Sequence, residues 1–211
     1  MPEKPRTPEA DLAFLRSIVE GGGPKGHLTL GVAYLAGGLL YGGQCLFHIG
    51  QFMGWIRWPD LANLAVVVGV LLAFTAVMVW SVREDRKAPQ PGPMATRTMN
   101  AAFSATGMAN LAIVAIFGAG AVREQDFSIW LYYPAVVFAF QAAAWYVAWE
   151  LKKRVWMLAV AIGGWLTAAA LGLLVRDPGP YLVVCTAALF LLFAAPGWVM
   201  TRDALKARAA R

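Results

Sequence analysis

Charged residues are scarce in this sequence of 211 residues. Only 14% of the residues are charged, whereas 59% are hydrophobic, and the mean hydropathy is +0.57. A water-soluble fold of this length cannot bury so large an apolar share of its residues. The composition therefore excludes an ordinary soluble domain and predicts that a lipid bilayer surrounds much of the chain.

Cysteine and histidine are also rare, with two residues of each. Two distant cysteines give neither a disulfide framework nor the ligand spacing of a zinc site. His27 and His48 would stand about 30 Å apart along one helix, which excludes the usual bis-histidine haem site. We therefore predict no resident cofactor or metal. No catalytic set of nucleophile, base and orienting group emerges either, so an enzyme is disfavoured.

What the sequence does contain is six apolar stretches of about 20 residues, the length that a membrane helix needs. None of them contains Asp, Glu, Lys or Arg, which disfavours an ion-driven transporter, because such proteins bind the driving ion through intramembrane ionisable groups. We predict an all-α integral membrane protein, a six-transmembrane-helix bundle. The predicted spans are residues 29–50, 61–81, 100–121, 128–148, 155–175 and 180–200.

The positive charges predict the orientation of these spans. They gather between spans two and three, between spans four and five, and after span six, whereas the other connections hold single arginines with an acidic neighbour. This pattern follows the positive-inside rule and places both termini in the cytoplasm. We therefore attribute the net charge of +6 to the orientation of the spans in the membrane and not to a surface that binds nucleic acid. The composition, rich in alanine, glycine and arginine, favours a bacterial inner membrane.

The chain divides into three parts on this interpretation. Residues 1–27 form a cytoplasmic N-terminal segment, residues 28–201 the transmembrane domain, and residues 202–211 a basic cytoplasmic tail. Short outer connections and a proline-rich linker after span two predict three antiparallel hairpins. Because the first, third and fifth spans are rich in small residues, we expect these spans nearer the centre of the bundle.

Residues 8–20 predict a short amphipathic helix before the first span. Thr7 can cap it, Pro8 suits its first position, and three glycines from Gly21 end it. One interpretation is a cytoplasmic docking helix for a protein partner. The other, which we favour, is a helix that lies at the membrane interface or packs under the bundle. The balanced charge of the segment lacks the excess of lysine and arginine that a strong anchor to anionic lipid would have.

A polar stripe runs along the first span. Tyr34, Tyr41, Gln44, His48 and Gln51 follow spacings of seven, three, four and three residues, which places them on one helical face. A polar face inside lipid must point toward other helices. Cys45 and His48, three residues apart, could offer two ligands to a soft metal, but two ligands are fewer than a metal site needs.

The third and fourth spans carry further polar residues, and Asn63 begins the second. Amide and hydroxyl groups of this kind often act only as glue between helices, at about 0.6 kcal/mol each. The alternative is a pocket for a small uncharged or lipid-like ligand. The candidate ligand-binding residues are Tyr41, Gln44, His48, Gln51, Asn100, Ser104, Asn110 and Gln141.

Two further positions in the spans carry an expectation. Cys45 and Cys185 should lie at the same depth, about 22 to 24 Å from the cytoplasmic side, so proximity is possible, although two unrelated buried thiols are the simpler expectation. Pro196 should kink or loosen the last span locally.

Two functions remain open at this point, since no motif resembles a family whose function could be transferred. The first is an accessory or regulatory membrane protein that acts through protein–protein contacts in the bilayer or at its cytoplasmic side. The second is a binder or carrier of a small uncharged or lipid-like molecule in a polar pocket between helices. Membrane lipids are expected partners in both cases, and nucleic acid in neither.

Overall fold

The computed structural model describes residues 25–87 and 94–209, and in this part of the chain every regular element is a helix. Six helices are long and apolar enough to cross a membrane, which confirms the predicted all-α membrane fold. The amphipathic helix expected over residues 8–20 lies outside the described residues. The elements are α2 (Lys25–Phe52), α3 (Asp60–Arg86), α4 (Met94–Glu124), α5 (Ser128–Lys152), α6 (Val155–Leu173), α7 (Pro178–Ala188), the π-helix η1 (Leu189–Ala194) and α8 (Ala195–Ala209).

The helix ends follow local rules. Gly54 has a φ of 74° in the turn after α2, a conformation that glycine adopts without steric cost. Asp60 places a negative charge in the first turn of α3, where the helix dipole favours it. Lys153 ends α5 in the left-handed conformation. Pro178 occupies the first turn of α7, where its missing N–H has no intrahelical partner to lose.

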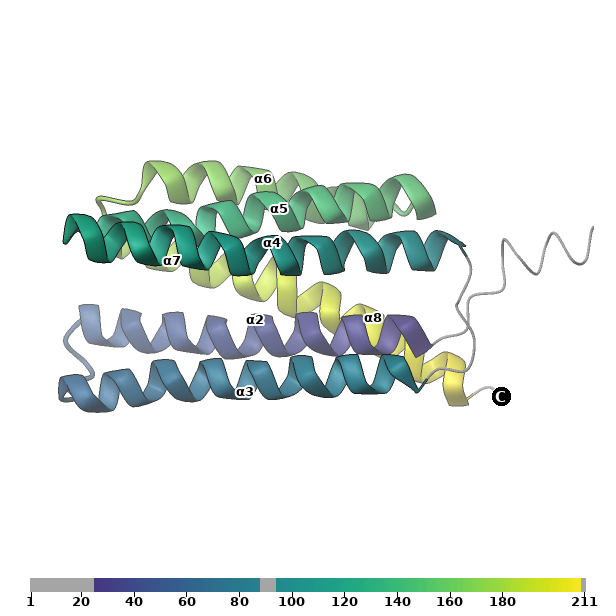
Figure 1. Ribbon diagram of the computed structural model, residues 1–211, viewed down its shortest axis with the longest axis horizontal. Helices are drawn as coiled ribbons and strands as arrows, with labels where there is room; N and C mark the ends of the chain where they lie inside the picture. Colours follow the sequence, from purple (N-terminus) through teal and green to yellow (C-terminus); the bar gives the residue numbers. More distant parts are fainter. Residues whose placement is uncertain (1–24, 88–93, 210–211) are drawn as a thin grey trace, which may run out of the picture.

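The helices form two groups that the last span connects. Figure 1 shows α2 beside α3 and, apart from them, α4, α5 and α6, while the segment from α7 through η1 to α8 runs diagonally between the groups. α5 packs against α4 and α6, and α2 packs against α3, α7, η1 and α8. α7 also contacts α6. The last span therefore holds the two groups together.

The contact between α2 and the last span is a backbone contact. A Cβ atom added to Gly38 would lie 2.3 Å from the backbone nitrogen of Ala194, closer than any real Cβ contact. A Cβ on Gly197 would lie 2.3 Å from the nitrogen of Leu35 and 2.8 Å from the carbonyl oxygen of Gly31. Small residues permit this approach, which is how helices gain packing contacts in lipid.

The last span contains a π-helix just before Pro196. Proline has no N–H to donate to the carbonyl of the residue four positions earlier, which is Leu192, and its ring clashes with that carbonyl. The backbone N–H of Ala195 bonds to the carbonyl of Phe190, five residues back. The loosening expected at Pro196 thus takes the form of a wider helical turn, a common feature where an α-helix must absorb a local misfit.

Burial differs strongly between the spans. The last span is the most buried, and α3 and α4 are the least buried. The expectation that the first, third and fifth spans lie nearest the centre is therefore wrong, because the fourth and sixth spans are more buried than any of them and the third is among the least buried. α4 packs against α5 with one face, and its opposite face is exposed. Small residues occur on both faces of α4, so their number did not indicate burial.

Candidate functional site

The turn between α2 and α3 is held by three polar side chains. His48 Nδ1 lies 3.0 Å from Gln51 Oε1, and because that oxygen can only accept, the histidine donates. Gln51 Nε2 in turn donates to Asn63 Oδ1, so a chain of hydrogen bonds runs from the last turns of α2 to the first turn of α3. We call His48, Gln51 and Asn63 the polar joint. Its polar groups satisfy one another inside an apolar bundle.

A second polar contact joins α2 to α5. The hydroxyl of Tyr34 donates a hydrogen bond to Oε1 of Gln141, 107 residues away. Tyr34 is buried at 6% exposure, and its ring stacks on Phe193 at 5.1 Å between centroids. The edges of Phe103 and Trp145 meet it at 5.4 and 5.3 Å. Side chains from three other elements, α4, α5 and η1, therefore contact Tyr34 of α2, and the space around it is filled with aromatic rings.

The remaining residues of the predicted ligand set lie elsewhere. Tyr41 is half-buried and meets Phe74 of α3 edge-on at 5.3 Å. Gln44 is half-buried and makes no side-chain hydrogen bond to the residues that the structure describes. Ser104 is exposed on α4. The structure thus brings His48 and Gln51 together but distributes the other candidates over the bundle.

Two asparagines of α4 are different. Asn100 Oδ1 and Asn110 Oδ1 are buried and have no hydrogen-bond partner among the described residues. The same holds for Nε1 of Trp145 on α5. A buried polar atom without a partner costs about 1–3 kcal/mol. The side chains of Asn110 and Trp145 lie beside the hydroxyls of Tyr133 and Tyr34, so Asn100 is the clearest candidate for a partner from outside the described residues.

Two hollows on the surface lie away from these residues. One, with a volume of about 270 Å³, is lined by Ile116, Ala119, Gly120 and Arg123. Another, of about 300 Å³, is lined by Ala121, Val122, Gln125 and Phe127. Both are open and lie at the C-terminal end of α4. None of the eight predicted ligand-binding residues lines either hollow.

The two cysteines meet in the structure. Sγ of Cys45 on α2 lies 3.9 Å from Sγ of Cys185 on α7, and the first thiol donates to the second. Equal depth was predictable from the sequence, but contact between two helices so far apart in the chain was not. In the described part of the chain no group of three or more His, Cys, Asp or Glu side chains gathers, so the pair formed by Cys45 and His48 has no third such ligand.

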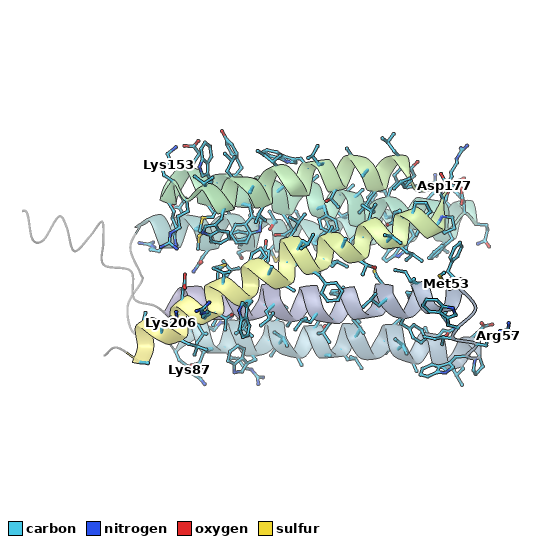
Figure 2. The ribbon with its side chains drawn as sticks, turned by 180° about the vertical axis from the view of Figure 1, so that it is seen from behind. Met53, Arg57, Lys87, Lys153, Asp177 and Lys206 are labelled. Carbon is cyan, nitrogen blue, oxygen red and sulfur yellow. The ribbon has the colours of Figure 1, made fainter. Side chains whose placement is uncertain are left out.

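The charges separate along the bundle axis. Figure 2 shows Lys87, Lys153 and Lys206 at one end and Arg57 and Asp177 at the other. The first end carries most of the basic residues that the structure describes. Its ion pairs are exposed, as for Arg154 with Asp203 at 3.9 Å, and such pairs contribute little stability.

At the other end, Asp126 caps the start of α5. Its Oδ1 accepts a hydrogen bond of 2.8 Å from the backbone N–H of Ser128. The Ser128 side chain is the largest influence, and together with this N–H and the charge of Arg176 it lowers the pKa of Asp126 below its ordinary value. The carboxylate therefore remains charged at neutral pH and favours the positive end of the helix.

Comparison with known proteins gives no match to a protein-family model, to a curated protein or to a solved structure. A function has to be argued from the residues described above. They offer three features. The first is the polar joint, the second is the group of aromatic rings packed around Tyr34, and the third is the half-exposed helix α4 with the amides of Asn100 and Asn110 on its inner side.

Proposed function

We propose that this chain is an accessory or regulatory protein of a bacterial inner membrane that acts through protein–protein contacts in the bilayer. The observation that carries the proposal is one face of α4. The residues of this face are Ala101, Ala105, Met108, Ala112, Ala115 and Ala119, and all six are exposed. We call them the α4 outer face.

The spacing of the α4 outer face favours a helix as its occupant. Its residues follow intervals of four and three, an average of 3.6 residues, which is the repeat of the α-helix itself, so they form one straight stripe along α4 against which a second helix can pack. Five of the six side chains are alanines, which allow a neighbouring backbone to approach closely. Met108 is flexible enough to fill an irregular gap. The opposite side of α4 holds Met99 and Phe103 in the core of this chain.

The closed polar contacts support the same proposal. His48, Gln51 and Gln141, which the sequence offered as ligand contacts, bond to other side chains of this chain. Side chains that are already paired have less capacity left for a ligand. The exposed hydroxyl of Ser104, beside the α4 outer face, is by contrast available to a neighbour in the membrane.

The test is purification of the full chain from its native membrane in a mild detergent, followed by identification of proteins bound in stoichiometric amounts. A variant with Ala105→Leu and Ala112→Leu adds bulk to the α4 outer face and should lose the partner. The matched control carries Ala65→Leu and Ala73→Leu on α3, where both alanines are also exposed, and should keep it. Retention of the partner by the first variant, or absence of any protein partner, would refute the proposal.

The proposed arrangement in the membrane has both termini in the cytoplasm and the chain folded as three antiparallel hairpins. The concentration of lysine and arginine at one end of the bundle supports this orientation. Packing of α2 on α3, of α4 on α5 and of α6 on α7 supports the hairpins. The docking role of residues 8–20 is tested by their deletion, after which a partner bound there should dissociate while the spans remain folded.

A second candidate function rests on the unpartnered amides. Asn100, Asn110 and Trp145 carry buried polar atoms that a small uncharged or lipid-like molecule could satisfy. Mass spectrometry of the gently extracted protein would then find a specific small molecule. Asn110→Leu should release it, whereas Asn63→Leu, in the polar joint, should not. If both variants retain the molecule, or if none is found, this candidate fails.

A further inference from the structure

The contact between Cys45 and Cys185 is the feature that the proposed function does not use. The two sulfur atoms lie 3.9 Å apart although the residues are 140 positions apart in the chain. They belong to different spans, α2 and α7, which pack directly against each other. Both residues are free thiols. A pair of this kind can do chemistry that neither thiol can do alone.

The geometry suits a covalent link between the sulfurs. A disulfide bond is about 2.05 Å long, so the sulfur atoms need to approach by about 1.9 Å in total. Rotation about the Cα–Cβ bond of each cysteine is the motion that moves its sulfur toward the other. Cys45 stands seven residues before the end of α2 and Cys185 seven residues after the start of α7, which is about 10 Å of helix in each case. The link would therefore form inside the bundle, below its less basic end.

The surroundings favour oxidation over metal binding. His48, the residue that could complete a soft-metal site with Cys45, bonds to Gln51. No group of three or more His, Cys, Asp or Glu side chains exists within the described residues. The buried neighbours of Cys185, among them Tyr181 and Leu189, are apolar or bonded elsewhere, as the Tyr181 hydroxyl is to the carbonyl of Leu131.

We propose that Cys45 and Cys185 form a reversible dithiol–disulfide pair that a small uncharged peroxide oxidises. An uncharged oxidant is required because an ion would have to leave water to reach the thiols. Cys45 reacts first, since it is only half-buried, whereas Cys185 is 5% exposed. Cys185 then acts as the resolving thiol.

The reaction proceeds in two balanced steps. The sulfur of Cys45 attacks one peroxide oxygen, the O–O bond breaks, and the thiol proton leaves with the second oxygen as water. The product is a sulfenic acid on Cys45. The sulfur of Cys185 then attacks the sulfur of Cys45, the S–O bond breaks, and a second water leaves. In total, the two thiols lose two electrons and two protons, and hydrogen peroxide is reduced to two waters.

The link has a defined mechanical consequence. It fixes the first part of the last span, ahead of the π-helix, to α2, while the backbone contacts of Gly38 and Gly197 fix the part that follows. Closing so long a loop restricts the unfolded chain, so the oxidised protein should unfold at a higher temperature than the reduced protein.

The test uses membranes that contain the full chain. They are treated with increasing hydrogen peroxide, quenched, denatured in SDS and labelled with a maleimide that adds a visible mass to each free thiol. The wild type should lose both labels together, regain both after dithiothreitol, and remain monomeric on a non-reducing gel. At the peroxide dose that oxidises the wild type, Cys45→Ser should keep the label on Cys185, whereas Cys185→Ser should lose the label on Cys45 and instead react with dimedone, which traps its sulfenic acid.

A matched control moves one thiol to the neighbouring position. The variant with Cys45→Ser and Leu46→Cys keeps two thiols, but Leu46 is exposed on another face of α2. It should form no internal disulfide, so its Cys185 should keep its label at the same peroxide dose. The proposal is overturned if the wild type keeps both labels, if dithiothreitol does not restore them, or if the link joins two chains. It is also overturned if Cys185 of this control loses its label as readily as Cys185 of the wild type.

Discussion

At the scale of single residues, the glycines of α2 differ in what surrounds them. Gly38 lies against the backbone of Ala194, where a Cβ atom would approach to 2.3 Å. Gly43 lies on the same helix with open space around the position of its missing Cβ. Both glycines look alike in the sequence, and only their neighbours from the last span distinguish them.

This difference predicts opposite effects of one substitution. Gly38→Ala should destabilise the protein by about 1–3 kcal/mol, because the backbones of α2 and the last span must move apart. Gly43→Ala should leave stability unchanged or raise it slightly, since alanine favours a helix over glycine. Thermal unfolding in detergent, followed by tryptophan fluorescence, measures both. Equal melting temperatures for the two variants would contradict the close backbone contact.

A second residue-scale prediction concerns pH. Because the pKa of Asp126 is lowered in the folded protein, its contribution to stability is present above the ordinary carboxyl value of about 3.9 and is lost as the pH falls through the folded value. Asp126→Ala should therefore lower the melting temperature at pH 7. The difference from the wild type should shrink as the pH falls below the ordinary carboxyl value and through the lower folded value. A difference that is independent of pH would mean that the charged carboxylate does not cap α5.

At the scale of elements, the sequence predicted which segments cross the membrane but not how they pack. Each predicted span lies largely within a helix of the structure, because a long apolar run without charges has few alternatives in lipid. The helices extend beyond most spans, as α4 does to Met94, since polar helix ends remain helical outside the apolar window. Pro196 likewise predicted a local irregularity in the last span, because proline lacks the N–H that an α-helix needs, and the structure has a π-helix there.

The contacts between elements could not be predicted from the sequence, and the reason is physical. Tyr34 pairs with Gln141, and Cys45 with Cys185, across more than a hundred residues. Helical periodicity shows which side of a helix is polar, but it contains no information on which other helix meets that side. The polar stripe of the first span therefore predicted inward-facing residues without predicting that they divide between a joint with α3 and a contact with α5.

The contact between α2 and α5 gives the element-scale prediction. Tyr34→Phe and Gln141→Leu each remove one partner of the same hydrogen bond. In a double-mutant cycle the two substitutions should show a coupling of about 0.6 kcal/mol in the free energy of unfolding, the typical value between membrane helices. Gln44→Leu, on α2 but without a hydrogen bond to Tyr34, serves as the control and should be additive with Tyr34→Phe. Additive effects of Tyr34→Phe and Gln141→Leu would mean that the hydrogen bond between these two side chains does not stabilise the protein.

At the scale of the whole molecule, the two ends of the bundle differ in charge. The end with Lys87, Lys153 and Lys206 is basic, and the end with Arg57 and Asp177 is balanced. In the proposed topology, which follows the positive-inside rule, the basic end lies in the cytoplasm. This orientation also places the cysteine pair nearer to the outer side of the membrane, where the environment is more oxidising.

The orientation can be tested with single cysteines in a background that lacks Cys45 and Cys185. Arg57→Cys should react in intact cells with a maleimide that cannot cross the membrane. Lys87→Cys should react only after the inner membrane is permeabilised. The opposite pattern would reverse the proposed topology, and reaction of both in intact cells would contradict a difference in side.

The proposal as a whole depends on what covers the α4 outer face in the membrane. The most direct measurement is photo-crosslinking in living cells, with a photoreactive amino acid in place of Met108 on α4 and, as a control, in place of Leu72 on α3; both side chains are exposed. The account predicts a crosslink to one defined membrane protein from position 108 and only lipid products from position 72. If position 108 also yields only lipid products, the face is covered by lipid and the chain does not act through it.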